Sequence, residues 1–317
     1  MILTITLNPS MDYIYHIDHF NLGKQNRFNT PTKMPGGKGI NASRTIASLN
    51  TEVLAFIFLG GTNGKIIYKE LQKEKFSNYH IKIEEESRNA ITIMHDNETH
   101  TEIVEKGPLI SEEKKIETFN SILEIISANH INIVSVNGSV NSENEFFYNE
   151  LLEVLRTKIN HEIIILMDVS KEKLKNIVNK SKYRPDFIKP NLFEFGELYD
   201  KEITEKSEVI EMLKLHNIDI PYVLVSCGGD GAVAKMKNKI YDVSIPSIQL
   251  VNPTGSGDAT VGGVAYSFEN HFSDEEILRQ AMACGVANAM ESGVGVVSQE
   301  NVNAISKQIT IKEVHSF

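Results

Sequence analysis

From residue 111 onward, the chain alternates between stretches of helical periodicity and short apolar stretches. The helical stretches are about 112–128, 144–155, 172–178 and 205–215, and the strand candidates are 131–136, 163–168, 187–189 and 222–226. Strands that alternate with helices are typical of a parallel sheet covered by helices on both faces. The alternation therefore predicts a doubly wound α/β fold, in which ligands bind beyond the carboxyl ends of the strands.

Polar residues follow each of these four strands. They are residues 137–139 (Asn-Gly-Ser), Asp168, residues 189–191 (Lys-Pro-Asn) with Glu194 one helical turn later, and residues 226–231 (Ser-Cys-Gly-Gly-Asp-Gly). The first predicted strand, residues 2–7, is followed by a turn and then by Asp12. Asp12 is either a ligand group at the same sheet edge or a solvated turn residue. We expect the polar strand ends to gather at one edge of the sheet.

The glycine-rich stretch 252–258 (NPTGSGD) leads directly into an apolar helical stripe over residues 261–268. The first amides of a helix have no partner within the helix, and the helix dipole is positive at that end. Gly255 and Gly257 lack the Cβ atoms that would keep a phosphate away from these amides. Asp258 adds an isolated carboxylate that can take a proton from an attacking hydroxyl. The stretch favours phosphoryl transfer, although by itself it also fits an ordinary glycine-rich turn.

A second glycine-rich stretch, residues 35–41 (PGGKGIN), also opens a helical stripe near the start of the chain. Its glycines let a ligand approach the backbone, while Lys38 and Asn41 offer charge and hydrogen bonds. The phosphate-binding pattern GxxxxGK[ST] is absent from it. The stretch therefore indicates either a site for a polar ligand or a tight turn.

Two segments look like excursions from the main sheet. Residues 13–32 are short, polar and strand-like at 13–17 and 27–30, and residues 89–95 and 100–105 form a predicted hairpin around a turn at 96–99, with Arg88 at its foot. Together they predict a small separate sheet. We expect its outer face to carry Ile91, Ile93, Ile103 and Val104, apolar surface that a partner subunit could cover.

Composition narrows the class of protein. Hydrophobic residues make up 41% of the 317 residues, and no segment has the length of a membrane span. The chain starts directly as a strand, without a signal-peptide pattern, so we expect a cytoplasmic protein that does not bind membranes. The formal charge of −10 argues against nucleic acid as a partner. Cys227 and Cys284 form no metal-binding or disulfide pattern and are interpreted as packing residues.

Four of these motifs together resemble a known family. Residues 35–41 and residues 255–258 (GSGD) are similar to the two signatures of the PfkB carbohydrate kinases, which have the ribokinase fold. Residues 189–194 (KPNLFE) resemble their NxxE motif, and residues 226–231 resemble their S-x-G-x-x-G strand end. The order and spacing agree over nearly the whole chain. The resemblance implies one ribokinase-like domain over residues 1–317, with a β-sheet lid formed by about 12–33 and 88–106.

The family implies transfer of the γ-phosphoryl group of ATP to a primary sugar hydroxyl, with Mg²⁺. By this resemblance Asp258 is the catalytic base, and the amides of Gly255, Ser256 and Gly257 bind the moving phosphoryl group. Glu194 would contact the magnesium ion through water, because Mg²⁺ gives up its hydration reluctantly. The implied nucleotide-binding residues are Lys189, Asn191, Ser226, Gly229 and Gly231. The implied sugar-binding residues are Asp12, Gly37, Lys38 and Asn41.

Cationic residues at the lid and cleft favour a substrate that already carries a phosphate. Arg27, Lys38 and Arg88 occupy such positions, and Ser139 is available nearby. Residues 101–108 resemble the lid strand of tagatose-6-phosphate kinases, and residues 2–9 are shared with 1-phosphofructokinases. We therefore expect a ketohexose phosphate kinase that converts tagatose 6-phosphate to the 1,6-bisphosphate. A homodimer through the lid is also expected.

Three alternatives compete with this interpretation. The first is a 1-phosphofructokinase acting on fructose 1-phosphate, and the second is a non-catalytic sugar-phosphate sensor, which has no need of the base Asp258. The third, a dinucleotide-dependent oxidoreductase, lacks the GxGxxG motif after the first strand. Two departures from the subfamily pattern leave the substrate and any monovalent-cation site open. Residues 140–143 (VNSE) replace a Leu-Pro-x-Gly segment, and Pro253 replaces a small or β-branched residue.

Overall fold

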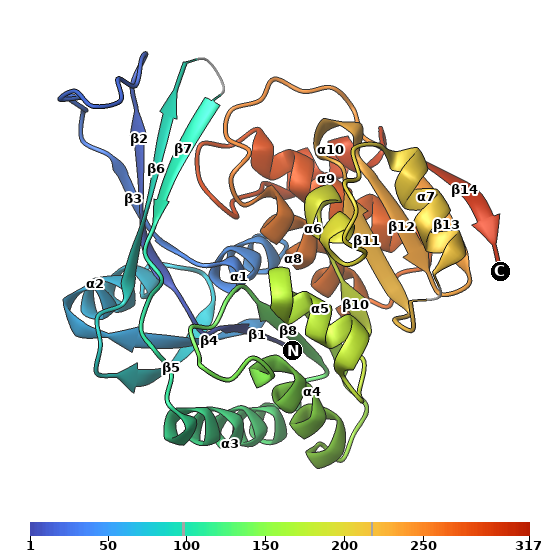
Figure 1. The fold of residues 1–317 in the computed structure, drawn as a ribbon, viewed down its shortest axis with the longest axis horizontal. Helices are drawn as coiled ribbons and strands as arrows, with labels where there is room; N and C mark the ends of the chain where they lie inside the picture. The colour runs from blue at the N-terminus through green and yellow to red at the C-terminus, as the bar shows by residue number, and fades with distance from the viewer. Residues whose placement is uncertain (97–98, 217) are drawn as a thin grey trace.

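A large twisted sheet forms the centre of the protein (Figure 1). The structure, a computed structural model, describes residues 1–96, 99–216 and 218–317. In these residues ten strands pair in the order β14-β13-β12-β11-β10-β9-β8-β1-β4-β5. Pairing is parallel from β5 to β11 and antiparallel from β11 to β14. The strands are β1 (Ile2–Thr6), β4 (Val53–Gly60), β5 (Ser77–Ile83), β8 (Ile133–Asn137), β9 (Ile164–Asp168), β10 (Phe187–Ile188), β11 (Tyr222–Ser226), β12 (Ala232–Met236), β13 (Lys239–Ser244) and β14 (Thr310–Ser316).

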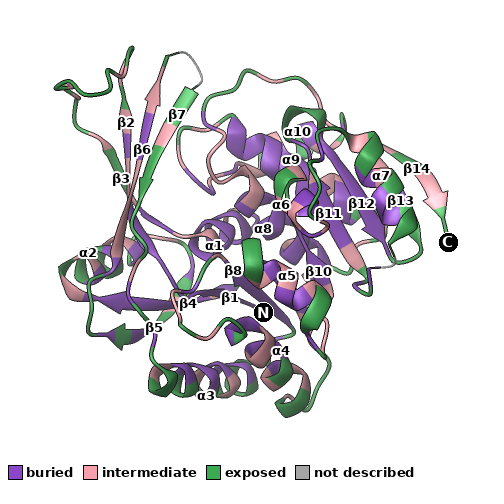
Figure 2. Ribbon diagram, in the orientation of Figure 1, coloured by how far each residue is buried: buried purple, intermediate pink, exposed green. Residues whose placement is uncertain are grey.

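Helices cover both faces of this sheet. One face packs against α3 (Glu112–Asn129), α4 (Phe147–Lys158), α5 (Lys171–Lys180), α6 (Leu192–Glu197) and α7 (Lys206–Leu215). The other packs against α1 (Lys38–Ser48), α2 (Gly61–Leu71), α8 (Ser256–Glu269), α9 (Asp274–Ala289) and α10 (Gln299–Ser306). The central strands are buried, and exposed residues lie on the outer sides of the helices (Figure 2). The predicted doubly wound α/β fold is confirmed.

A second sheet of four strands stands apart from the helix-covered body (Figure 1). Its order is β3-β2-β6-β7, from β3 (Thr32–Gly36), β2 (Ser10–His16), β6 (Arg88–His95) and β7 (Thr99–Val104). The predicted hairpin is therefore present, although residues 97–98 of its turn lie outside the described residues. Residues 27–30 were expected to be strand-like but belong to no strand; β3 begins only at Thr32.

The burial of the second sheet differs from the expectation on one point. Ile103 and Val104 are about half exposed, as expected, but Ile93 is only 5% exposed. Successive residues of a strand point to opposite faces, and Ile91 pairs with Ile103 while Ala90 pairs with Val104, so Val104 lies on the other face of the sheet from Ile91, Ile93 and Ile103. The apolar outer surface is consequently smaller than the sequence suggested.

Within the described residues, no helix has the length and apolar character needed to span a bilayer.

Candidate active site

The carboxylate of Asp258 lies in the first turn of α8 and is buried. Its partner is Asn41 of α1, whose Nδ2 donates a hydrogen bond to Asp258 Oδ2 at 2.8 Å. The two glycine-rich stretches, 217 residues apart in the sequence, therefore meet through their polar residues. Burial raises the pKa of Asp258 to about 6, against the opposing effect of Lys38. A carboxylate with this pKa is ionised at neutral pH and remains basic enough to accept a proton.

The start of α8 has the backbone geometry of an anion site. Gly255 has a φ of 80°, and a Cβ there would lie 2.3 Å from Val294 Cγ1, so only glycine fits. The amide of Ser256 donates to the Pro253 carbonyl at 3.2 Å. The amides of Gly257 and Asp258 come next at this positive end of the helix dipole.

Two lysines, Lys38 and Lys189, contact the same buried carboxylate, that of Asp168. Asp168, at the end of β9, is 1% exposed and lies 3.2 Å from Lys38 Nζ and 3.8 Å from Lys189 Nζ. A Cβ placed on Gly257 would be 3.0 Å from Lys189 Nζ, so this ammonium lies directly against the start of α8. Positive charge and free backbone donors thus face the same space next to Asp258.

The charges in this group depend on one another. Although burial opposes ionisation of Asp168, the ammonium groups of Lys189 and Lys38 hold its pKa below the ordinary value. Burial alone would lower the pKa of Lys38, but the carboxylates of Asp168, Asp258 and Glu194 raise it. Lys38 therefore remains cationic near neutral pH, as binding of phosphate oxygens requires.

Asn191 and Glu194 form a capping box at the start of α6. Asn191 Oδ1 accepts from the Glu194 amide at 2.8 Å, and Glu194 Oε2 accepts from the Asn191 amide at 2.9 Å. The box fixes the Glu194 carboxylate while its second oxygen remains available. Among the described residues no group of three or more metal-ligating side chains occurs. One oriented carboxylate oxygen is the kind of donor that Mg²⁺ uses when phosphates and water supply its other ligands.

A cleft of about 640 Å³ adjoins the start of α8. Its polar end contains four predicted nucleotide residues, and a parallel bridge between Asn191 and Ser226 joins two of them. Gly229 leaves open space there, whereas a Cβ on Gly231 would lie 2.2 Å from the Val243 carbonyl oxygen. The polar residues are Asn191, Ser226, Gly229 and Gly231, and the apolar walls include Ile245, Ile248, Leu250, Met282, Val286 and Ala289. This combination suits a flat base with a phosphate tail.

Asp12 of β2 and Arg88 of β6 lie on neighbouring strands of the second sheet, close enough for their charges to interact. Asp12 lies within β2 rather than in a turn, and Ser10 Oγ donates to its Oδ1 at 2.6 Å. Burial raises the pKa of Asp12 to about 6. Burial also lowers the pKa of Arg88, against the opposing charges of Asp12 and Glu105. A partly buried guanidinium close to a carboxylate is a site for a polar ligand that has both hydroxyl and phosphate groups.

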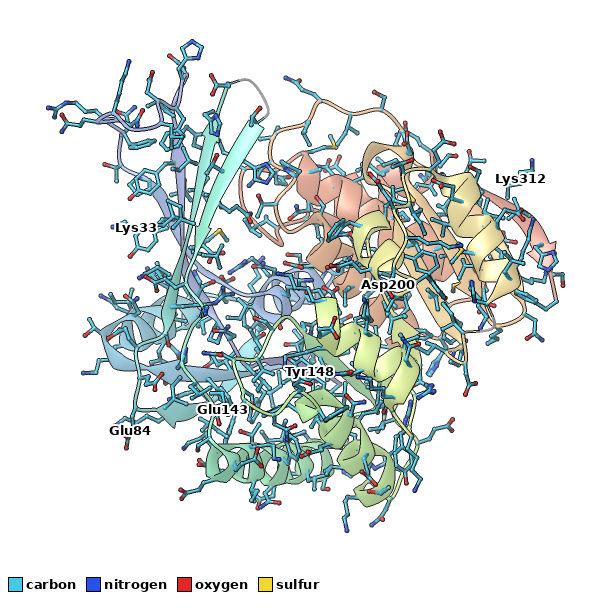
Figure 3. All side chains as sticks on the ribbon, viewed as in Figure 1. Lys33, Glu84, Glu143, Tyr148, Asp200 and Lys312 are labelled. Carbon is cyan, nitrogen blue, oxygen red and sulfur yellow. The ribbon has the colours of Figure 1, made fainter. Side chains whose placement is uncertain are left out.

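The segments around Asn8 connect the second sheet to the main sheet. Asn8 Nδ2 donates to the Lys106 carbonyl at 2.9 Å and to Ser139 Oγ at 3.2 Å, while Arg88 Nε donates to the Asn8 carbonyl at 3.1 Å. Tyr148 of α4, labelled in Figure 3, donates to the Gly138 carbonyl at 2.9 Å and supports the same turn from below. Ser139 and Arg88 are thus brought to one place.

The remaining predicted sugar residues divide into two groups. Gly37 precedes α1 and packs against Thr6, so it is part of the assembled site. Arg27 is exposed in the segment between β2 and β3, and its Nη2 donates to Gln25 Oε1 at 3.5 Å. The structure does not bring Arg27 together with Lys38 and Arg88.

Both departures from the subfamily pattern have a structural role. Asn141 Nδ2 donates to the Gly107 carbonyl at 2.7 Å, and the Asn141 carbonyl accepts from the Ile110 amide at 2.8 Å. It therefore fixes the segment that returns from β7. Pro253 lines the cleft beside α8 and supplies the carbonyl that accepts from the Ser256 amide.

Sequence reasoning missed three residues of the site. Asp168 was seen as a polar strand end but was given no role, and its contact with two lysines depends on tertiary structure. Asn288 of α9 donates to the Thr254 carbonyl at 2.9 Å and accepts from the Gly295 amide at 2.7 Å, inside the otherwise apolar second half of the helix. Arg44 is a buried cation in α1. A polar residue at an apolar helix position was the available signal for Asn288 and Arg44.

Comparison with known proteins gives a consistent result. Residues 5–301 match the pfkB family of carbohydrate kinases. The chain is 37% and 36% identical, over 318 aligned residues, to tagatose-6-phosphate kinases from two strains of Staphylococcus epidermidis. Each alignment covers 99% of this chain and 100% of the relative.

Solved structures share the fold. Phosphofructokinase-2 from Escherichia coli in complex with substrates and products has a TM-score of 0.86 at 23% identity. The tetrameric inhibited form of the same enzyme has a TM-score of 0.84 at 23% identity. Both comparisons cover 96% of this chain and 98% of the other.

Proposed function

Because the chain belongs to the pfkB family of carbohydrate kinases, we propose that it transfers the γ-phosphoryl group of ATP to a primary hydroxyl of a ketohexose phosphate. Tagatose 6-phosphate is the proposed substrate and the 1,6-bisphosphate the product, supported by the relatives of matching length. The observation that carries the proposal is Asp258, a buried carboxylate with a raised pKa at the start of a helix and beside two lysines.

The residues at the start of α8 perform the transfer. Asp258 accepts the proton of the attacking sugar hydroxyl, and Asn41 holds the carboxylate in place through its hydrogen bond. The amides of Gly255 and Gly257 and the ammonium of Lys189 stabilise the negative charge of the phosphoryl group, whereas the amide of Ser256 already donates to the Pro253 carbonyl. Lys38, held by Asp168, provides a further cation for the bound phosphates.

The cleft next to α8 binds ATP. Its apolar walls accept the base, and Asn191, Ser226, Gly229 and Gly231 line the phosphate path. Glu194 would hold Mg²⁺ through water, since its carboxylate is oriented by the capping box and keeps an oxygen available. When bound, the ion neutralises charge on the β- and γ-phosphates.

The second sheet is the proposed lid of a single domain over residues 1–317, with lid segments at about 12–33 and 88–106. Arg88 is the proposed ligand of the phosphate already on the sugar, and Asp12, Gly37 and Ser139 bind sugar hydroxyls. Arg27 remains a predicted phosphate ligand that the structure does not place with the others. Closure of the lid would exclude water from the transfer site.

A homodimer through the lid is also proposed. Ile103 and Val104 of the edge strand β7 are 55% and 52% exposed, and an edge strand with apolar side chains is suited to pairing with another chain. The protein is proposed to work in the cytoplasm, where buried free thiols such as Cys227 and Cys284 stay reduced. Sedimentation equilibrium measures the assembly state directly.

The substrate is tested by a coupled ADP-release assay with ATP and magnesium. Tagatose 6-phosphate, fructose 1-phosphate, fructose 6-phosphate and ribose are ranked by kcat/KM. We expect tagatose 6-phosphate to lead, with Asp258→Asn as the control for contaminating kinase activity. A lead for fructose 1-phosphate would keep the mechanism and change the substrate. Absence of turnover with every sugar would instead support a non-catalytic sensor.

A further inference from the structure

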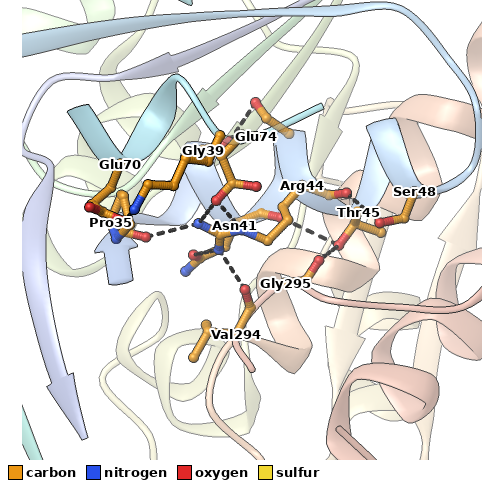
Figure 4. Close-up of polar contacts among 12 residues, drawn as sticks. Pro35, Gly39, Asn41, Arg44, Thr45, Ser48, Glu70, Glu74, Val294 and Gly295 are labelled. Atoms are coloured by element: carbon orange, nitrogen blue, oxygen red, sulfur yellow. Dashed lines mark hydrogen bonds and ion pairs between the residues drawn. The ribbon is translucent and has the colours of Figure 1, made fainter. Parts of the chain in front are cut away.

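Arg44 is a buried cation whose guanidinium contacts four other residues (Figure 4). It lies in α1, is 6% exposed, and Nη1 donates to Asn41 Oδ1 at 3.1 Å and to the Val294 carbonyl at 2.6 Å. Nη2 donates to the Pro35 carbonyl at 3.0 Å, and Nε donates to Glu74 Oε1 at 2.9 Å. One guanidinium thus joins α1, the end of β3, the chain after α2 and the segment after α9.

The contact with Asn41 determines how that amide faces the base. A guanidinium only donates hydrogen bonds, and an ionised carboxylate only accepts them. Between Arg44 and Asp258, the Asn41 amide therefore has a single favourable orientation, with Oδ1 toward Arg44 and Nδ2 toward Asp258. Without Arg44, rotation of the amide would place its oxygen against the carboxylate, which would disfavour ionisation of Asp258.

The contact with Val294 supports the helix start that follows Gly255. Val294 and Gly295 pack against Gly255, where a Cβ would lie 2.3 Å from Val294 Cγ1 and 3.2 Å from the Gly295 amide nitrogen. Thr45, the neighbour of Arg44, donates to the Gly295 carbonyl at 2.9 Å. Helix α1 therefore holds the 294–295 segment, and this segment determines where the α8 amides lie.

These contacts reach the phosphoryl-transfer site without entering it. Arg44 is not among the residues that line the cleft and has no hydrogen bond to the Asp258 carboxylate, and its ion pair is with Glu74, which follows α2. Glu74 balances the charge and orients the planar fork so that all its donors meet acceptors.

We propose that Arg44 is a positioning residue for phosphoryl transfer. It sets the Asn41 amide toward Asp258 and holds the 294–295 segment against the start of α8. The inference rests on the proposed role of Asp258 as the base.

The test is Arg44→Lys, with Arg156→Lys as the matched control. Lysine keeps the charge, but its single nitrogen cannot reach all four acceptors. The guanidinium of Arg156 also donates to two backbone carbonyls, of Ile163 and Arg184, and to the carboxylate of Asp186. Arg156 lies on α4, outside the proposed site. Both substitutions should lower the melting temperature, but only the first should change the chemistry.

For Arg44→Lys we expect kcat to fall about tenfold to a hundredfold, while KM for ATP changes by less than about threefold. We also expect the acid limb of the kcat–pH profile to move to higher pH by about half a unit or more. Arg156→Lys should keep the wild-type kcat, and the acid limb of its kcat–pH profile should lie at the same pH as in the wild type. If Arg44→Lys matches Arg156→Lys in both quantities, Arg44 is only a structural residue and the inference is wrong.

Glu74→Ala provides a second, milder test if Arg44→Lys does not fold. The Glu74 side chain is 21% exposed. Its removal takes away the carboxylate that orients the Arg44 guanidinium, while Arg44 itself stays in place. A several-fold lower kcat with a shifted acid limb is expected, and a wild-type kcat and limb would overturn the inference. Asp258→Asn, measured in parallel, separates the two claims. If Asp258→Asn loses nearly all turnover while Arg44→Lys keeps the wild-type kcat, only the role of Arg44 is refuted. If Asp258→Asn keeps a near-normal kcat, the role of Asp258 as the base is refuted.

Discussion

Asp258→Asn should make the free enzyme more stable at neutral pH, even though it removes the proposed base. The folded protein raises the pKa of Asp258 from its ordinary value of 3.8 to about 6. Between these values the folded state binds more protons than the unfolded state, so the stability contribution of this group is lost as pH rises through about 6. The folded and unfolded pKa values of Asp258 differ by about two units, and each unit corresponds to ~1.4 kcal/mol. Ionised Asp258 therefore lowers the free energy of unfolding by about 3 kcal/mol at pH 8.

Asparagine removes this cost and keeps the contact, because its side-chain oxygen can still accept the hydrogen bond from Asn41. Urea unfolding of both proteins should therefore show a stability advantage of the variant that grows with pH. By linkage, about 1.4 kcal/mol of the difference should appear between pH 5 and pH 8. A difference that is constant over this range, or a variant less stable than wild type at pH 8, would refute the argument that burial penalises this carboxylate.

Two further substitutions test the lid and the nucleotide cleft. Arg88→Ala should raise KM for the sugar phosphate about tenfold or more with a smaller change in kcat, because a charge-assisted contact is lost. The control is Lys33→Ala, which removes an exposed cation of β3 (Figure 3). If the two substitutions raise KM equally, Arg88 does not bind the phosphate of the sugar. Gly231→Ala should lower the free energy of unfolding by about 2 kcal/mol or more, since φ is 96° and the new Cβ would meet the Val243 carbonyl. Gly229→Ala, which has open space, should change it by less than about 0.5 kcal/mol in the same urea titration, and similar losses in both would contradict the steric argument.

The central strands could be predicted from the sequence because both of their faces are buried. Strands β8, β9 and β11 are short apolar runs between helical stretches, and their observed bounds differ from the predicted ones by at most two residues. Strands β5 and β14 were missed because each lies at an edge of the sheet and has many exposed residues, so no apolar run marks it.

Site residues could be predicted from the sequence where the local backbone requires a particular residue type. Gly255 and Gly231 have positive φ, and Asn191 with Glu194 forms a capping box, and all of these are short-range patterns. Asp168 and Arg44 depend on contacts with residues far away in the sequence, such as Lys38 with Asp168 and Val294 with Arg44. No spacing rule predicts which strand end meets which helix. Arg27 remains a prediction, because it is exposed in the segment between β2 and β3 and its hydrogen bond there is to Gln25.

The most direct test of the role of Asp258 is the pH dependence of kcat with ATP, magnesium and the sugar phosphate that leads the substrate assay. The base must be ionised, so kcat for the wild type should fall about tenfold per pH unit below an apparent pKa of about 6 and be level above it. Asp258→Asn should turn over at least about a thousandfold more slowly at every pH above about 6. A wild-type profile that is flat from pH 5 to pH 8, or a variant that keeps the same limb at near-normal rate, would contradict the role of Asp258 as the base.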